Sequence, residues 1–193
     1  MKVYVMNGKE YRLPNSLTPF QQEMYVHLID WKWEHITREP GRDRGNLYDA
    51  ILPDTLIGSY PILYPPIRDA AQQHLQVYPF RIHKYFHHMA SSQAANLNLF
   101  LPIVLHPDAA VVLRALRPDL SRLALPQLDH GYRVEFWDGP FGNLRDKGPT
   151  TGTDSDIAIA YYNHEGELCL WLVEHKLTEK EITTCGGAGS RGR

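Results

Sequence analysis

Hydrophobic and polar residues follow different patterns in the two halves of the chain, and the first half opens with two short elements. Residues 1–14 alternate around Asn7-Gly8, a dipeptide typical of tight turns, which predicts a β-hairpin. Thr18-Pro19 is a strong helix start, and Gln21 is placed to complete a capping box. Apolar residues then recur near helical spacing, so residues 18–37 are predicted to form a helix that packs on a core.

The middle of the chain contains prolines and glycines that interrupt regular secondary structure. Residues 38–66 are rich in both, which predicts a long irregular connection with short pieces of structure. A helical pattern covers about residues 67–100 and is expected to bend or break around Pro79. A further helix is predicted after Pro102, near residues 108–116.

The pattern changes to alternation and apolar runs after Pro126, which predicts a small sheet. The expected strands are YRVEFW (132–137), DIAIAYY (156–162) and ELCLWLVEHK (167–176). The polar turn at Gly166 is short enough to make the last two an antiparallel hairpin. Helices followed by a sheet predict an α/β or α+β fold.

Composition narrows the class of protein without naming an activity. The chain has 193 residues, of which 43% are hydrophobic and 22% charged, as in a soluble globular protein with a real core. The two cysteines, Cys169 and Cys185, give no disulfide framework and fit a reducing compartment. No leader and no run of about 20 apolar residues is visible, so we expect a cytoplasmic protein that does not enter a membrane.

Two acids and a lysine stand out at the ends of the last two predicted strands. Glu174 and Lys176 are two residues apart, so on a strand they share a face with their Cα atoms roughly 7 Å apart. A hairpin turning at Gly166 brings Asp156 across from Glu174, allowing for a bulge. Two carboxylates and an ammonium group are therefore expected to converge at one edge of the sheet.

This set suits the hydrolysis of phosphodiester bonds. Mg²⁺ prefers oxygen ligands and is usually held by one or two carboxylates, with waters and substrate phosphates completing its shell. A neighbouring lysine can orient the attacking water or neutralise developing charge. The alternative is a weak surface ion pair, because a Glu-x-Lys triplet also arises by chance in a chain of this composition.

These residues resemble the PD-(D/E)XK nuclease superfamily, whose signature is an acid at the start of one strand and Glu-x-Lys in the next. Here those positions are Asp156 and the EHK of residues 174–176. The stretch SSQAANLNLF, residues 91–100, is similar to a helix of an uncharacterised bacterial subgroup of these proteins. The resemblance covers about residues 80–180.

The resemblance implies a restriction-endonuclease-like fold, a mixed sheet flanked by helices, after a mainly helical N-terminal half. It also implies Mg²⁺ or Mn²⁺ held by Asp156, Glu174 and the main-chain carbonyl of His175, with Lys176 near the attacking water. Gln93, with Ser92, is expected to point toward the site from its helix; a buried amide tied to backbone groups is the equal alternative. The remaining candidates are Asp154 as alternate ligand or supporting acid, and Glu23 or Glu34 as an assisting N-terminal acid.

The resemblance also divides the chain. Residues 1–66 are expected to form an N-terminal extension, residues 67–180 the nuclease core, and residues 181–193 a flexible tail. The family fold continues with a helix and a strand after Glu-x-Lys, whereas only 17 residues follow Lys176. This departure predicts a chain that is C-terminally truncated or frameshifted, with an exposed sheet edge and a missing wall at the site.

Two classes of function are therefore expected. The first is a metal-dependent endonuclease that acts on DNA, in defence or repair; the second is an inactive nuclease-like domain that binds nucleic acid or has a structural role. A zinc site at His83 and His87 is disfavoured, because no His-Glu-x-x-His pattern is present, and the glycines at 139–152 do not form a Walker loop. DNA is the expected partner, and a homo-oligomer is left open.

Overall fold

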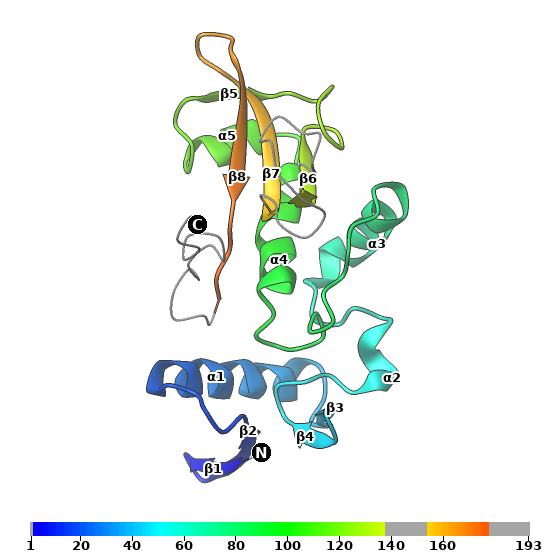
Figure 1. Ribbon diagram of the computed structural model, residues 1–193, viewed down its shortest axis with the longest axis vertical. Coiled ribbons are helices and arrows are strands. Elements are labelled where there is room, and N and C mark those ends of the chain that lie inside the picture. Colours follow the sequence, from blue (N-terminus) through cyan, green and yellow to red (C-terminus); the bar gives the residue numbers. More distant parts are fainter. Residues whose placement is uncertain (1, 138–153, 178–193) are drawn as a thin grey trace, which may run out of the picture. The chain divides into compact units, whose positions relative to one another are not determined.

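The computed structural model describes residues 2–137 and 154–177, and of Asp154 only the main chain. The chain divides into two compact units. The first contains Met1–Ile57, His88–Ser92 and the chain from Lys176 onward, and the second contains Gly58–His87 and Gln93–His175. Figure 1 shows the elements of each unit, and each unit is described by itself.

The first unit begins with the predicted hairpin. Strands β1 (Lys2–Met6) and β2 (Lys9–Leu13) pair antiparallel. Asn7 and Gly8 both have positive φ, 51° and 74°, as a two-residue hairpin turn requires. The sequence prediction of a hairpin at Asn7-Gly8 is confirmed.

Helix α1 (Pro19–His35) follows and starts as its sequence predicts. Thr18 caps the helix and forms the reciprocal capping box with Gln21. Lys32 on this helix is fully buried, and its ammonium group donates hydrogen bonds to the carbonyls of Glu39 at 2.6 Å and Asp49 at 3.0 Å. The lysine thereby ties α1 to the segment that follows it.

The connection after α1 contains short elements, as expected for a segment rich in proline and glycine. These are β3 (Gly41–Asp43), β4 (Asn46–Tyr48) and α2 (Asp54–Ile57). Asp49 is buried directly after β4 and pairs with the guanidinium group of Arg12 at 2.9 Å. This ion pair joins the first hairpin to the second within the unit.

The helices of the second unit are shorter and more separated than the sequence predicted. A 3₁₀ turn (Pro65–Ile67) leads into α3 (Arg68–Val77), and α4 (Ser92–Val104) begins only after an intervening non-helical stretch. The predicted break around Pro79 is confirmed, because α3 ends two residues before this proline, but the interruption is longer than the sequence predicted. Helix α4 continues through Pro102 instead of ending before it. The next helix, α5 (Ala109–Arg114), lies where the sequence predicted it.

The sheet of the second unit is built around one central strand, β7 (Asp154–Asn163). Strand β8 (Leu168–Val173) pairs with β7 along residues 157–162 and so occupies one of its edges. The strands β6 (Tyr132–Trp137) and β5 (Leu120–Leu123) therefore follow one another along the other edge of β7. All described pairings are antiparallel, so the mixed sheet expected from the resemblance is not seen among these strands.

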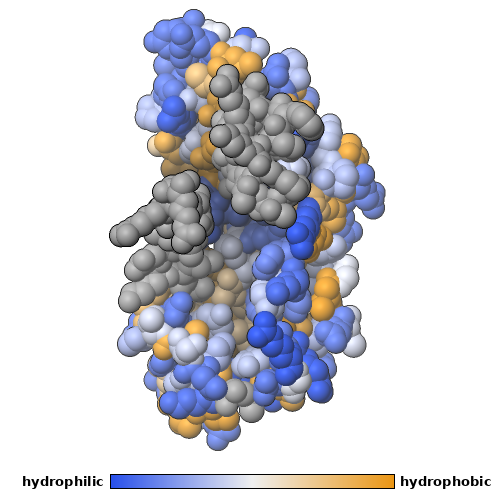
Figure 2. All heavy atoms as spheres, viewed as in Figure 1, coloured by the Kyte–Doolittle hydropathy of each residue, from blue (hydrophilic) through white to orange (hydrophobic). Residues whose placement is uncertain are grey.

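The core of the second unit lies between the sheet and its helices. β7 is buried from Ile157 to Tyr161, and α4 buries an apolar face that includes Leu97 and Leu101. Strand β8 is less protected, with Leu168 54% and Leu170 44% exposed. Figure 2 shows that hydrophobic residues also reach the surface elsewhere, in separate groups among hydrophilic ones. The fold is thus a mixed α/β arrangement in which β7 is the best-buried strand and carries Asp156 near its start.

Candidate active site

The pairing of β7 with β8 decides whether the two predicted acids meet. Ile157 pairs with Val173, and the same register continues to Tyr162 and Leu168. Continued by one residue beyond the end of β8 at Val173, this register would bring Asp156 opposite Glu174. Residues that lie opposite each other project from the same face of a sheet, with Cβ atoms about 5 Å apart. The hairpin turns at Gly166, whose φ is 80°, as predicted.

Asp156 is held from two directions. Its Oδ2 accepts a hydrogen bond from the main-chain N–H of His175 at 2.5 Å. Its main-chain carbonyl accepts a second hydrogen bond from Nδ2 of Asn96 on α4 at 3.1 Å. Asp156 is half-buried whereas Glu174 is exposed, so the first acid is anchored in the sheet and the second lies at the surface.

The segment after β8 differs from the sequence prediction. The strand ends at Val173, so Glu174, His175 and Lys176 follow the strand instead of continuing it to residue 176. The spacing expected for Glu174 and Lys176 on an extended strand therefore does not apply. Lys176 is exposed and belongs to the first unit, and its part in the site stays a prediction.

Gln93 is buried and fully engaged by the main chain. Its Oε1 accepts from the N–H of His83 at 2.9 Å, and its Nε2 donates to the carbonyl of Arg81 at 2.9 Å. Only 4% of the residue is exposed. This arrangement is the alternative that the sequence left open, an amide that ties α4 to backbone groups. A direct role for Gln93 at the site stays a prediction.

The oxygen groups near Asp156 suit a hard divalent cation. The carboxylates of Asp156 and Glu174 and the carbonyl of His175 are ligands of the kind that Mg²⁺ and Mn²⁺ prefer. Across residues 2–137 and 154–177, no three His, Cys, Asp or Glu side chains are grouped so as to hold a metal by themselves. The donor set fits a cation that keeps several waters, because Mg²⁺ is commonly held by only one or two carboxylates.

The other candidate ligands have different positions. Asp154 begins β7, two residues before the predicted start of the strand, and its main chain is opposite Trp137. Glu23 and Glu34 are exposed on α1 in the first unit. Ser92 is the first residue of α4. The assignment of any of these residues to the metal stays a prediction.

Asn96 was missed by the sequence reasoning, although the signal was present. It is a polar residue three positions after Gln93 in a mainly apolar helical stretch, so both lie on one face of α4. Both are buried. Buried polar residues usually have a defined hydrogen-bond partner, and the partner of Asn96 is the main chain of Asp156.

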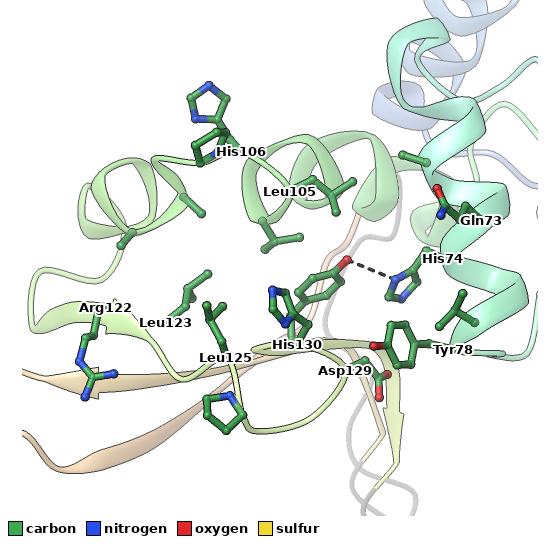
Figure 3. Close-up of a pocket in the computed structure, with 18 residues that line it drawn as sticks. Gln73, His74, Tyr78, Leu105, His106, Arg122, Leu123, Leu125, Asp129 and His130 are labelled. Carbon is green, nitrogen blue, oxygen red and sulfur yellow. Dashed lines mark hydrogen bonds between the residues drawn. The ribbon is translucent and has the colours of Figure 1, made fainter.

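A cavity of about 990 Å³ is a second feature of the same unit (Figure 3). It lies between α3, the end of α4, α5 and the residues before β6, and His74 and Tyr132 form part of its wall. Nδ1 of His74 lies 3.2 Å from the hydroxyl of Tyr132, and their rings stack. Burial lowers the pKa of His74 below its ordinary value, with Asp129 opposing the shift, and raises the pKa of Tyr132 to about 12.

The cavity is separate from the pair of acids. Tyr132 lies opposite Ile159 in the sheet, so the two project from one face. Asp156 is three positions from Ile159 on the same strand and therefore projects from the opposite face. His74 and Tyr132 consequently take no part in the candidate site.

Comparison with known families identifies the family of the chain. A family model named REase-ARP, described as Restriction Endonuclease associating with ARP, matches residues 25–193. The chain belongs to this family. The resemblance to restriction-endonuclease-like proteins predicted from the sequence is thus confirmed at the level of the family, and membership in REase-ARP indicates a nuclease-related protein. Comparisons with curated proteins and with solved structures found no match.

The REase-ARP match includes α4 and the whole β7–β8 hairpin, whereas the β1–β2 hairpin precedes it. Within the described residues, no helix is long and apolar enough to cross a membrane. The predicted tail, residues 181–193, and most of the glycine-rich stretch before Asp156 lie outside the described residues.

Proposed function

We propose that this REase-ARP chain is a metal-dependent endonuclease that hydrolyses phosphodiester bonds in DNA. The observation that carries the proposal is the register of β7 and β8, in which Ile157 pairs with Val173, the residues directly next to Asp156 and Glu174. The hydrogen bond from His175 to Asp156 supports it, because it ties the residue after Glu174 to the first acid. The family description supports DNA as the substrate.

Each residue has a proposed role. The carboxylates of Asp156 and Glu174, with the main-chain carbonyl of His175, would hold one Mg²⁺ or Mn²⁺. A cation bound there neutralises charge that develops on the phosphodiester and lowers the pKa of an attacking water. Lys176 would orient that water, and Gln93 would hold α4 and the loop at Arg81 and His83 in place.

The exposure of the two acids agrees with these roles. Glu174 is at the surface and accessible to a polymer substrate, whereas the half-buried Asp156 is fixed by two hydrogen bonds. A fixed ligand lowers the entropy that a site loses when it binds a cation. The site therefore combines one rigid acid with one accessible acid.

Plasmid cleavage tests the proposal. The wild-type protein is expected to nick or linearise supercoiled DNA in Mg²⁺ or Mn²⁺ and to lose this activity in EDTA. Asp156→Asn, Glu174→Gln and Lys176→Met should each abolish cleavage. Glu165→Gln is the matched control, because Glu165 is an exposed acid at the turn end of the same hairpin and its substitution removes the same charge.

Two results would overturn this assignment. Cleavage that persists in Asp156→Asn and Glu174→Gln would show that the acids lie elsewhere. A wild-type protein that binds DNA in a salt-sensitive manner without cutting it would favour the second class of function, an inactive nuclease-like binding domain.

A further inference from the structure

Asn96 occupies an unusual position for an amide. It lies in the middle of α4, is 0% exposed, and uses its Nδ2 to donate to the main-chain carbonyl of Asp156 at 3.1 Å. Its Oδ1 is buried and has no hydrogen-bond partner among the residues that the structure describes. Leaving a buried amide half satisfied costs about 1–3 kcal/mol. An apolar side chain of the same size would avoid that cost.

The backbone of β6 is unusual beside Asp156. β6 and β7 keep one register from Tyr132 opposite Ile159 to Trp137 opposite Asp154, and Glu135 lies within this stretch, beside Asp156. Glu135 has a φ of 50°, a left-handed conformation that is rare for a residue other than glycine. Beside this irregular point of β6, Asn96 supplies a donor from α4 for the Asp156 carbonyl.

Two different segments of the chain therefore bind the two acceptor groups of Asp156. The carbonyl is bound by Asn96 on α4, and the carboxylate is bound by the N–H of His175 after β8. Without the bond from Asn96, the main chain at Asp156 would lose its link to α4 and could rotate more freely about its φ and ψ bonds. Such a rotation would move the carboxylate relative to Glu174.

We infer that Asn96 is a positioning residue that holds Asp156 in the orientation needed to bind a divalent cation together with Glu174. This inference rests on the proposed function, because it concerns the same cation. Asn96 acts only through the main chain of Asp156 and touches neither the cation nor DNA. The cost of burying its unpaired Oδ1 is offset by the order that its Nδ2 gives to Asp156.

The test compares two asparagines on the same helix. Asn96→Leu replaces the amide by an apolar group of the same size and removes the donor to Asp156. Asn98→Leu is the matched control: Asn98 also bonds backbone groups, the N–H of Tyr64 at 2.7 Å and the carbonyl of Ile62 at 3.0 Å, but none in the sheet. Each variant is titrated with Mn²⁺ by calorimetry, and its melting temperature is measured in EDTA.

We expect Asn96→Leu to bind Mn²⁺ about tenfold more weakly than the wild type, the loss typical when a residue that supports a ligand is removed. Its melting temperature in EDTA should stay within a few degrees of the wild-type value, because removal of the unpaired Oδ1 offsets the loss of one hydrogen bond. Asn98→Leu should show the reverse, a lower melting temperature with unchanged affinity for Mn²⁺. If Asn96→Leu does not fold, Asn96→Ala removes the same donor without adding bulk.

The outcomes separate this inference from the proposed function. If the wild type binds Mn²⁺ and a folded variant at Asn96 binds it equally tightly, the positioning role is overturned and the proposed function is not. Absence of both Mn²⁺ binding and cleavage in the wild type would instead overturn the proposed metal-dependent activity, and the inference with it.

Discussion

Substitution of Asp156 by asparagine and by alanine separates the structural role of this residue from its proposed role as a ligand. Both substitutions remove the negative charge. Asparagine keeps an oxygen that can accept the hydrogen bond from the N–H of His175, whereas alanine removes the acceptor. The bond from Asn96 goes to the main chain of Asp156 and is present in both variants.

We consider two opposing contributions to the change in the free energy of unfolding that each substitution causes without metal. A hydrogen bond to a charged group contributes about 1.5 kcal/mol at the low end of the usual range, which suits a half-buried acid, and a neutral one about 0.5–1 kcal/mol. Two carboxylates about 5 Å apart repel each other by about 0.8 kcal/mol in a water-like environment. Removing the charge relieves this repulsion from Glu174. The net change is therefore about zero for Asp156→Asn and a loss of about 0.7 kcal/mol for Asp156→Ala.

Thermal unfolding in EDTA and in Mn²⁺ measures these differences. For a chain of this length, 1 kcal/mol corresponds to about 2–4 °C, so Asp156→Ala should melt roughly 1–3 °C below the wild type and Asp156→Asn at nearly the same temperature. Mn²⁺ at about 100 times its dissociation constant should stabilise the wild type by about 2.7 kcal/mol and neither variant. A large loss of stability in Asp156→Asn without metal, or full stabilisation of it by Mn²⁺, would refute this reasoning.

Three further predictions concern buried groups elsewhere. Burial lowers the pKa of Lys32 to about 8, so between pH 8 and 10 the unfolded chain binds a proton that the folded chain does not. The free energy of unfolding of the wild type should therefore rise with pH across that window. Urea unfolding measured at several pH values should show this rise in the wild type and not in Lys32→Met. The hydrogen bond from Tyr161 lowers the pKa of Asp119, so Tyr161→Phe should melt below the wild type above about pH 4, by a difference that shrinks as the pH falls below 3.8; an equal difference at all pH values would contradict this. Gln93→Leu removes two hydrogen bonds to the 81–83 backbone and should lower the melting temperature, while cleavage assayed well below that temperature should persist; loss of cleavage there would restore Gln93 as a residue of the site.

The local patterns in the sequence predicted most of the elements, because their causes are local. Asn7-Gly8 favours positive φ at both turn positions, and Thr18 with Gln21 satisfies the first free N–H groups of α1. The alternation and apolar runs after Pro126 predicted β6, β7 and β8, and the short turn at Gly166 predicted that the last two would pair. The break predicted around Pro79 is present, but the sequence did not show its length, fourteen non-helical residues between α3 and α4.

The sequence also predicted the residue types at the candidate site, but it did not predict the register of the strands that carry them. Counting from Gly166 left Asp156 and Glu174 two positions out of step, whereas the observed pairing aligns their neighbours, Ile157 and Val173. The sequence also did not predict that β8 ends at Val173, because Glu174, His175 and Lys176 include no residue that excludes a strand.

Tertiary structure alone decided how Asp156 is held. The sequence by itself determined that an acid opens a buried strand and that a second acid follows the next strand, because such patterns depend on neighbouring residues. It did not determine that Glu135 has a positive φ or that Asn96, sixty residues away along the chain, binds the carbonyl of Asp156. Contacts of that kind depend on how a helix packs against a sheet, and the free energy of packing is a property of the assembled core and of no single segment.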